Sequence, residues 1–205
     1  MNTQTHALAG LLVARLYPGS ATWSQAQRTS IFAAALVGGF LPDLALYIMV
    51  PVELLLGTSM GEIWRHSYYN PPWSQFDAAC NSAPLFAVLA LVAWPLRWTW
   101  LMALAVAALV HISMDFLVHS SDGHMHFWPF SDWRFVSPLS YWEPGKGAFW
   151  ITLVEAVLGL AACVWMFTQL KAIGWRVLLG LFAALYLATF ALLVRWALYG
   201  PPFGG

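Results

Sequence analysis

The sequence predicts an all-α integral membrane protein, a polytopic bundle of about five spanning helices with a short N-terminal half-helix. Of its 205 residues, 60% are hydrophobic and only 9% are charged, whereas soluble domains carry about 25% charged residues. The mean hydropathy is +0.67. Several apolar runs reach the roughly 20 residues that a helix needs to cross a bilayer, and backbone in lipid must satisfy its own hydrogen bonds. A soluble globular or nucleic-acid-binding protein is therefore excluded.

The elements follow the apolar runs along the chain. These runs occupy residues 7–16, 30–56, 84–96, 98–119, 148–170 and 175–199. The first run ends at Tyr17 and is too short to span a bilayer, so it predicts a half-helix. The third run is also short, and we expect its helix to begin earlier, near Asn81. The two long connections, 57–82 and 120–147, join the helices of a single domain, residues 1–205.

Basic residues near the helix ends predict the orientation. With alternating helices, one side carries five basic residues and no acidic residue: Arg15, Arg28, Arg97, Lys171 and Arg176. The other side carries four basic residues: Arg65, Arg134, Lys146 and Arg195. The first side is then cytoplasmic. Both long loops face outward, which is the periplasm if the membrane is a bacterial inner membrane.

Ionisable residues inside spanning segments are costly and mark function by default. Four of them, His6, Asp43, His111 and Glu155, come from four different apolar runs. At roughly 1.5 Å per residue, all four fall about 15–22 Å above the cytoplasmic boundary. Ionisable residues with no common role would lie at different depths in the membrane. We therefore expect these side chains to share one polar layer in the outer half of the membrane.

The fourth apolar run, residues 98–119, adds a second signal. His111, Asp115 and His119 are spaced i, i+4 and i+8, which places them on one helix face. Histidine and aspartate at this spacing can hold a divalent metal together, or one can orient the other. The following loop adds His124 and His126.

Simpler interpretations exist for individual residues. Asp43 follows a proline and could satisfy backbone groups freed by a kink. Glu155 could pair with Arg195, which also lies near the outer side. His124 and His126 lie in a Trp-rich interfacial loop and could be solvated.

The order of several short motifs resembles a known family. The motifs are Thr5-His6, Leu41-Pro42-Asp43, Arg65-His66-Ser67, His111-Ile-Ser-Met-Asp115, Trp128-Pro129-Phe130 and Trp133-Arg134-Phe135. Over roughly residues 5–160 this order is similar to the YdjM (DUF457) family of inner-membrane, metal-dependent hydrolases. The resemblance implies that five residues correspond to the family's metal-binding and catalytic positions: His6, Asp43, His66, His111 and Asp115.

Two positions depart from the family pattern. Ala45 stands where the family commonly has a second aspartate, and Gly61 stands where it has a histidine. We therefore expect one metal rather than two, or a site rebuilt with His119, His124 or His126. The same departures leave open a non-catalytic membrane subunit, or an assembly partner of a larger complex, that retains a degenerate site.

The donor types predict the metal and its chemistry. Mixed histidine and carboxylate ligands suit zinc, with manganese or iron as alternatives. We expect His6, His111 and Asp115 to be the core ligands, with His66 closing the site from its loop. Asp43 would be a fourth ligand or the general base.

Two further residues complete the expected hydrolysis by a metal-activated water. Glu155 would orient a ligand or accept a proton, and His119 would protonate the leaving group. Because the polar layer lies inside the membrane, a lipid ester, phosphoester or lipid-linked substrate is expected. Arg65 and Arg134 could hold a phosphate head group or serve as ordinary interfacial anchors. Haem ligation fits the sequence poorly because the carboxylate Asp115 lies beside His111. A transporter fits poorly because the sequence shows no inverted repeat.

Overall fold

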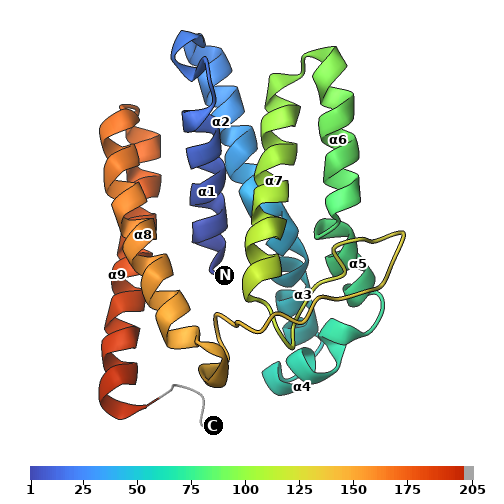
Figure 1. Ribbon diagram of the computed structural model, residues 1–205. Coiled ribbons are helices and arrows are strands. Elements are labelled where there is room, and N and C mark those ends of the chain that lie inside the picture. Colours follow the sequence, from blue (N-terminus) through green and yellow to red (C-terminus); the bar gives the residue numbers. More distant parts are fainter. Residues whose placement is uncertain (201–205) are drawn as a thin grey trace.

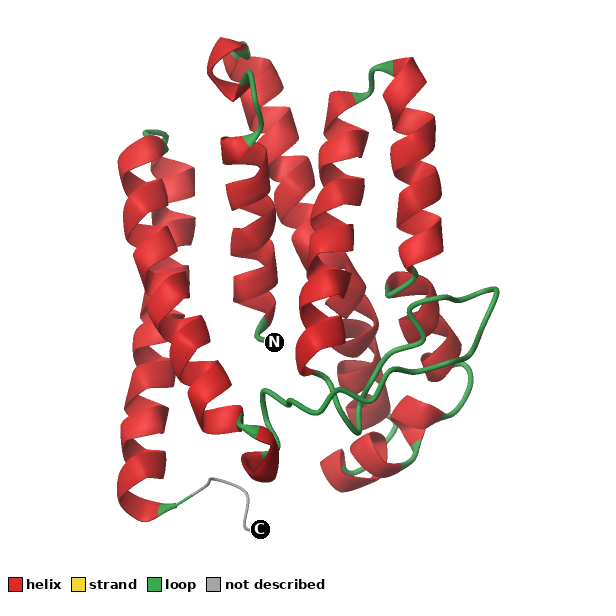
Figure 2. Cartoon of the chain, in the orientation of Figure 1, coloured by secondary structure: helices red, strands yellow, loops and turns green. Residues whose placement is uncertain are grey.

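The computed structural model describes residues 1–200, in which every regular element is a helix (Figures 1 and 2). The α-helices are α1 (Thr3–Leu16), α2 (Gln25–Phe40), α3 (Leu44–Leu55), α4 (Met60–Arg65), α5 (Trp73–Cys80), α6 (Ala83–Leu96), α7 (Thr99–Val118), α8 (Ala148–Gln169) and α9 (Ile173–Tyr199). Five helical stretches are long and apolar enough to cross a membrane: Gln25–Leu55, Trp73–Leu96, Thr99–Val118, Ala148–Gln169 and Ile173–Tyr199. The prediction of five spans plus a half-helix is confirmed.

The half-helix α1 lies at the centre of the bundle. It packs against α2 and α7 and, more lightly, against α8. Its 14 residues extend about 21 Å at 1.5 Å per residue, less than the roughly 30 Å hydrocarbon core of a bilayer. Leu8 and Leu11 are buried in the main hydrophobic core, and the chain starts midway along the height of the bundle (Figure 1). Because α1 is too short to span the bilayer, neighbouring helices bury its apolar side chains.

Glycines on α2 allow this close packing. A Cβ at Gly39 would overlap the carbonyl oxygen of His6 on α1, and a Cβ at Gly38 would overlap the carbonyl of Leu104 on α7. Small residues at such crossings let helix backbones touch in membrane proteins. The close approach brings the N-terminal end of α1 against the α2–α3 junction and α7.

The long first span bends at a 3-10 turn, Leu41–Asp43, which joins α2 to α3. Pro42 is buried in this turn, and its missing N–H prevents an uninterrupted helix. The bend places Asp43 at the inner surface of the bundle, where it is buried.

The two long connections differ in structure. The 57–82 connection is largely helical, with α4 and α5. Helix α6 begins at Ala83, which confirms the expected start near Asn81, and α5 extends this second span back to Trp73. A break at Asn81 and Ser82 separates α5 from α6, and the Ser82 hydroxyl caps α6 by accepting from the Leu85 N–H at 3.2 Å. The 120–147 connection is irregular apart from the short turn Pro144–Lys146, and it passes close to the C-terminal end of α7 (Figure 2).

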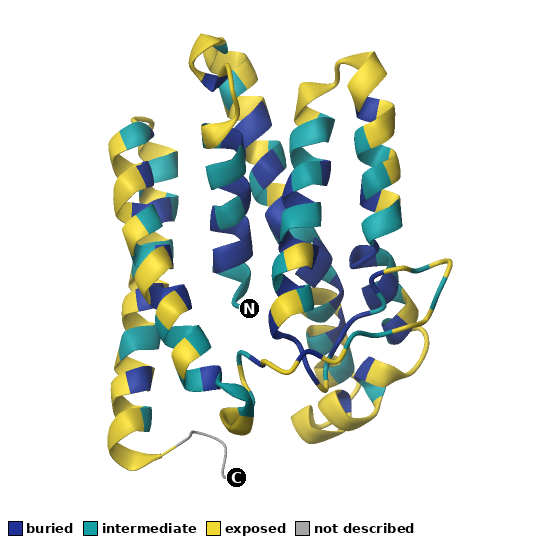
Figure 3. Cartoon of the chain, viewed as in Figure 1, coloured by how far each residue is buried: buried dark blue, intermediate teal, exposed yellow. Residues whose placement is uncertain are grey.

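The outer faces of the bundle are apolar. Exposed residues dominate the outward sides of α6, α8 and α9 (Figure 3), including Leu91 at 72% and Trp94 at 78% exposure. Contiguous apolar surface of this extent is rare on soluble monomers. These faces are suited to lipid, as a polytopic bundle requires.

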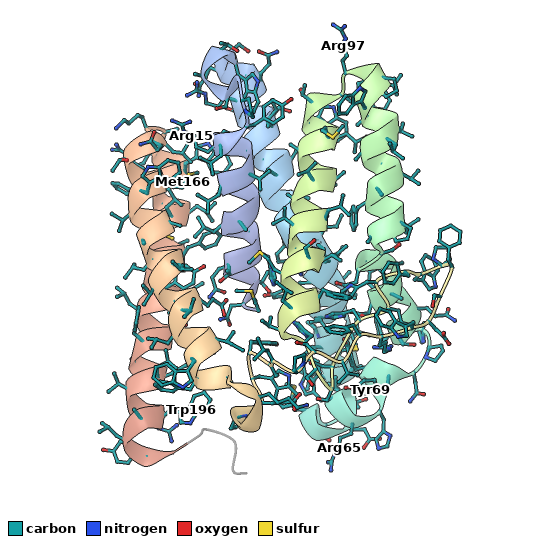
Figure 4. All side chains as sticks on the ribbon, viewed as in Figure 1. Arg15, Arg65, Tyr69, Arg97, Met166 and Trp196 are labelled. Carbon is teal, nitrogen blue, oxygen red and sulfur yellow. The ribbon has the colours of Figure 1, made fainter. Side chains whose placement is uncertain are left out.

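The ends of the bundle separate the basic residues as the alternating helices predict. Arg15 and Arg97 lie at one end, and Arg65 lies at the opposite end with the two long loops (Figure 4).

Candidate metal centre

Four expected site residues from three parts of the chain meet at the loop end of α7. His6 comes from α1, Asp43 from the Leu41–Asp43 turn, and His111 and Asp115 from α7. His6 and His111 are 0% exposed and Asp115 is 1% exposed. Three of the four residues in the predicted polar layer, His6, Asp43 and His111, therefore lie in one buried cluster with Asp115.

Asp115 is the hub of this cluster. Its Oδ1 atom lies 3.0 Å from Nε2 of His6, and its Oδ2 atom lies 2.9 Å from Nε2 of His111. The two imidazole rings stack with centroids 3.6 Å apart and an interplanar angle of 13°. The α-amino group of Met1 lies 2.9 Å from Oδ1 of Asp115, so a cationic group already contacts this carboxylate.

Unlike the Met1 amino group, which donates a hydrogen bond to Asp115, the two histidines form no hydrogen bond with this carboxylate. Nε2 of His6 and Nε2 of His111 are buried and make no hydrogen bond, although each lies near an Asp115 oxygen. One ligand atom from each of the three residues falls within 4.8 Å of the others. Ligands about 2.0–2.1 Å from a tetrahedral zinc ion are roughly 3.3 Å apart. The donor types, their spacing and their unpartnered lone pairs fit a divalent metal.

Contacts behind the cluster fix the orientation of two of its members. Nδ1 of His111 donates to the carbonyl of Gly39 at 2.7 Å, which leaves Nε2 as the ring nitrogen with a free lone pair. Asp43 accepts a hydrogen bond from Thr3 Oγ1 at 2.5 Å, and its Oδ1 lies 3.7 Å from Nε2 of His111. Asp43 makes no side-chain cap on α3, so the interpretation of Asp43 as a kink cap is wrong.

A second group shares the Asp115 carboxylate. Asp115, His119 and His124 are all buried and also place one ligand atom each within 4.8 Å of one another. Nε2 of His119 lies 3.1 Å from Oδ1 of Asp115, and its Nδ1 lies 2.9 Å from Asp122. Nδ1 of His124 lies 2.9 Å from Asp77. Each histidine thus has Nδ1 beside a carboxylate, which is the usual arrangement behind a metal-binding Nε2.

His119 and Asp122 form an ion pair just beyond the end of α7. Burial opposes the charged form of His119, but its contacts with Asp115 and Asp122 outweigh burial and raise its pKa to about 9. Burial likewise opposes ionisation of Asp122, yet the neighbouring His119 lowers the pKa of this carboxyl. Without a metal, His119 is therefore protonated at neutral pH.

The loop histidines are not solvated. His124 is 3% exposed and His126 is 4% exposed, so the interpretation of both as solvated loop residues is wrong. Tyr68 and Asp77 enclose His124, and Nδ1 of His126 lies 3.3 Å from the carbonyl of Asn81. All three partners lie in the 57–82 connection, so the two long loops hold each other together over the centre.

Glu155 lies beside the cluster and is held by the start of the chain. Its Oε1 atom accepts hydrogen bonds from Thr5 Oγ1 at 2.6 Å and from the Asn2 N–H at 2.8 Å. The Tyr186 hydroxyl donates in turn to Thr5 Oγ1, and the two oxygens are 2.8 Å apart. The Oε2 atom is buried without a hydrogen bond. Arg195 is exposed on α9, so the alternative pairing of Glu155 with Arg195 is wrong.

Three loop residues considered from the sequence lie outside both groups. His66 is exposed at the end of α4. Arg65 donates to the carbonyl of Gly61, and Arg134 donates to the carbonyl of Gly123 at 2.6 Å. Among the described residues, the structure therefore does not bring His66 to the buried cluster.

Comparisons of the chain with models of protein families, with curated proteins and with solved structures find no match.

Proposed function

We propose that this protein is a membrane-embedded, metal-dependent hydrolase of the YdjM type. One observation carries the proposal: His6, His111 and Asp115 are fully buried, and the ring Nε2 atoms are orphaned beside the carboxylate. A buried polar group without a partner costs about 1–3 kcal/mol. A divalent cation would satisfy all three side chains at once.

The proposed metal is zinc, with manganese or iron as alternatives. His6, His111 and Asp115 would hold it, and Asp43 is near enough to be a fourth ligand. A bound divalent ion would supply positive charge and lower the pKa of a coordinated water toward about 7. The cluster itself contributes a fixed geometry, because the Gly39 carbonyl holds His111 in one orientation.

The protein's own groups around the cluster can move protons. Glu155 has one oxygen committed to Thr5 and Asn2 and one unpartnered oxygen, so it can accept a proton from an attacking water. His119 lies 3.1 Å from Asp115, and its pKa of about 9 keeps it protonated at neutral pH, so it can donate to a leaving group.

The proposed substrate is a lipid or lipid-linked ester or phosphoester. The cluster is buried within apolar spanning helices, toward the loop end of α7, where a molecule already in the membrane has the easiest access. We further propose that the membrane is the bacterial inner membrane, with both long loops facing the periplasm. The excess of basic residues at the end that carries Arg15 and Arg97 supports this orientation.

Elemental analysis of the purified protein tests the centre. We expect near-stoichiometric zinc, manganese or iron in the wild type and none in a His111→Ala, Asp115→Ala double variant. Ser113→Ala is a matched control, because Ser113 is exposed on the same helix. Two equivalents of metal would indicate that Asp115 also serves the group formed with His119 and His124. No metal in the folded wild type, after metal has been offered, would rule out the hydrolase.

A second function, a non-catalytic subunit with a degenerate site, is favoured by one observation. His66, an implied ligand, lies exposed away from the cluster, and Ala45 and Gly61 supply no donor. Retention of metal with no hydrolysis of lipid esters or phosphoesters, together with a stoichiometric membrane partner, would support this alternative.

A further inference from the structure

An apolar groove runs along the bundle between α1, α7 and α8. Its volume is about 480 Å³, and its lining is almost entirely hydrocarbon. Small and apolar residues of α1 and α8 form its walls, including Ala9, Leu12, Leu158 and Ala162. A volume of this size is typical of small-molecule sites, which are about 300–1,000 Å³.

The groove passes the start of α1 and the side chain of Glu155, although almost none of its lining surface is polar. Met1, Thr5 and Glu155 are among its lining residues, and the amino group of Met1 contacts Asp115 of the candidate metal centre. Glu155 is 3% exposed, and its Oε2 atom has no hydrogen-bond partner. A buried carboxylate oxygen with a free lone pair calls for a hydrogen-bond donor. The groove therefore runs alongside a residue with an unsatisfied acceptor, between Trp150 and Ala162 on α8.

The direction of the groove matches that of a lipid molecule. On α8 its lining runs from Trp150 to Ala162, twelve residues of helix, or about 18 Å at 1.5 Å per residue. Trp150 lies near the loop end of α8 and Ala162 lies past its midpoint, so the groove extends from the loop end toward the middle of the spanning helices. A lipid of the leaflet on the loop side has its polar group and its hydrocarbon chain in this order.

The packing of α8 gives a lateral opening. Among the described elements, α8 packs extensively on α9 and lightly on α1, and it has no substantial contact with α7. Tyr186 of α9 lies over Gly159, where a Cβ would overlap its ring, and reaches Thr5 behind the groove. The wall behind the groove is thus fixed, whereas the side between α7 and α8 faces the surrounding lipid.

We propose that this groove binds one hydrocarbon chain of a lipid from the leaflet on the loop side, with the polar group of the lipid at the loop end of the groove. The occupant is a lipid chain because the lining is apolar, the open side between α7 and α8 faces the bilayer, and the groove runs from the loop end toward the middle of the spanning helices. The identification of this lipid as the substrate rests on the proposed hydrolase function. Binding of the chain does not depend on it.

Photochemical labelling tests the groove. The full-length protein is placed in phosphatidylethanolamine and phosphatidylglycerol vesicles doped with phosphatidylethanolamine that carries a diazirine in one acyl chain. After illumination, labelled residues are mapped by peptide mass spectrometry. We expect label on Ala9 and Leu12 of α1, which lipid reaches through the groove, as well as on Leu91, which is 72% exposed to bulk lipid.

Matched variants separate specific binding from bulk lipid contact. Ala162→Phe fills the groove and should abolish the label on α1 while leaving that on Leu91. Ala161→Phe, exposed on the same helix and outside the groove lining, should change neither. If Ala162→Phe does not insert, Ala9→Phe fills the groove from the opposite wall, and Leu12 alone reports the label on α1. Label on α1 that persists in the filled groove, or that is absent from the wild type, would overturn the proposal.

The Asp115→Asn variant distinguishes the two proposals. We expect its α1 residues to be labelled as in the wild type, because the chain lies apart from the metal ligands. Label on α1 in a protein that holds no metal would support the groove and refute the hydrolase. Metal and hydrolysis without any groove-dependent label would refute the groove alone.

Discussion

Replacement of Gly39 by alanine should damage both the packing and the candidate metal centre. Gly39 touches the backbone of His6 on one side, and its own carbonyl accepts the Nδ1 hydrogen of His111. A Cβ at Gly39 would overlap the carbonyl oxygen of His6 and come within 2.9 Å of the Cα atom of Ala7. Since both obstacles are backbone, no side chain can rotate away to relieve the overlap.

The size of the effect follows from this geometry. Overpacking of a well-packed core costs typically 1–3 kcal/mol, and a clash with backbone belongs at the upper end, about 3 kcal/mol. For a chain of this length, 1 kcal/mol corresponds to roughly 2–4 °C in Tm, so the apparent Tm in detergent should fall by about 6–12 °C. A misplaced Gly39 carbonyl should also weaken metal binding by about 10–100-fold, the usual loss for a group that orients a ligand.

The assay compares thermal unfolding and zinc titration of Gly39→Ala with those of Gly180→Ala. Gly180 lies within α9 with open space where a Cβ would stand. Its replacement removes no contact, and the higher helix propensity of alanine should stabilise the protein by up to about 1 kcal/mol. If Gly39→Ala matches the wild type in both Tm and zinc affinity, the close contact of α1 and α2 and its role in the centre are refuted.

Three further predictions concern the cluster itself. In chelator, His119 has a folded pKa of about 9, above its unfolded value of about 6.5. Protonated His119 therefore contributes about 3 kcal/mol to the free energy of unfolding. This contribution is complete below pH 6.5 and is lost as the pH rises through 9. The Tm difference between the wild type and His119→Gln should therefore shrink from pH 6 to pH 10, and a difference that grows would contradict the raised pKa. Glu155→Gln should keep bound metal but lose about 10²–10⁴-fold in lipid-ester hydrolysis, and loss of metal would instead make Glu155 a ligand. His66→Ala should leave the metal content unchanged, whereas His6→Ala should abolish metal binding. Loss of metal in both variants would place His66 at the centre.

The spans and the polar layer could be predicted because both depend on local rules. Apolar length identifies a spanning helix, and a constant rise per residue converts sequence position into depth. This is why His6, His111 and Asp43 were expected together, and the structure does bring them together.

Other parts depended on contacts between distant segments. Glu155 is paired with Thr5, 150 positions away, and His124 with Asp77, 47 positions away. Neither pairing has a local pattern, and both follow from how α8 packs on α1 and how the two long loops meet. Helix α4 did carry a local signal, since Ser59 precedes Glu62 at capping-box spacing and its hydroxyl accepts from the Glu62 N–H.

The position of α1 has a consequence for biogenesis. This helix is too short to cross a bilayer and carries His6 on its buried side, so it needs α2 and α7 before it is protected from lipid. Thr5 gains its carboxylate partner only from α8, 150 residues further along the chain. The residues of α1 are therefore synthesised well before the helix that completes their contacts. Full burial of α1 would report that α2, α7 and α8 have all been inserted correctly.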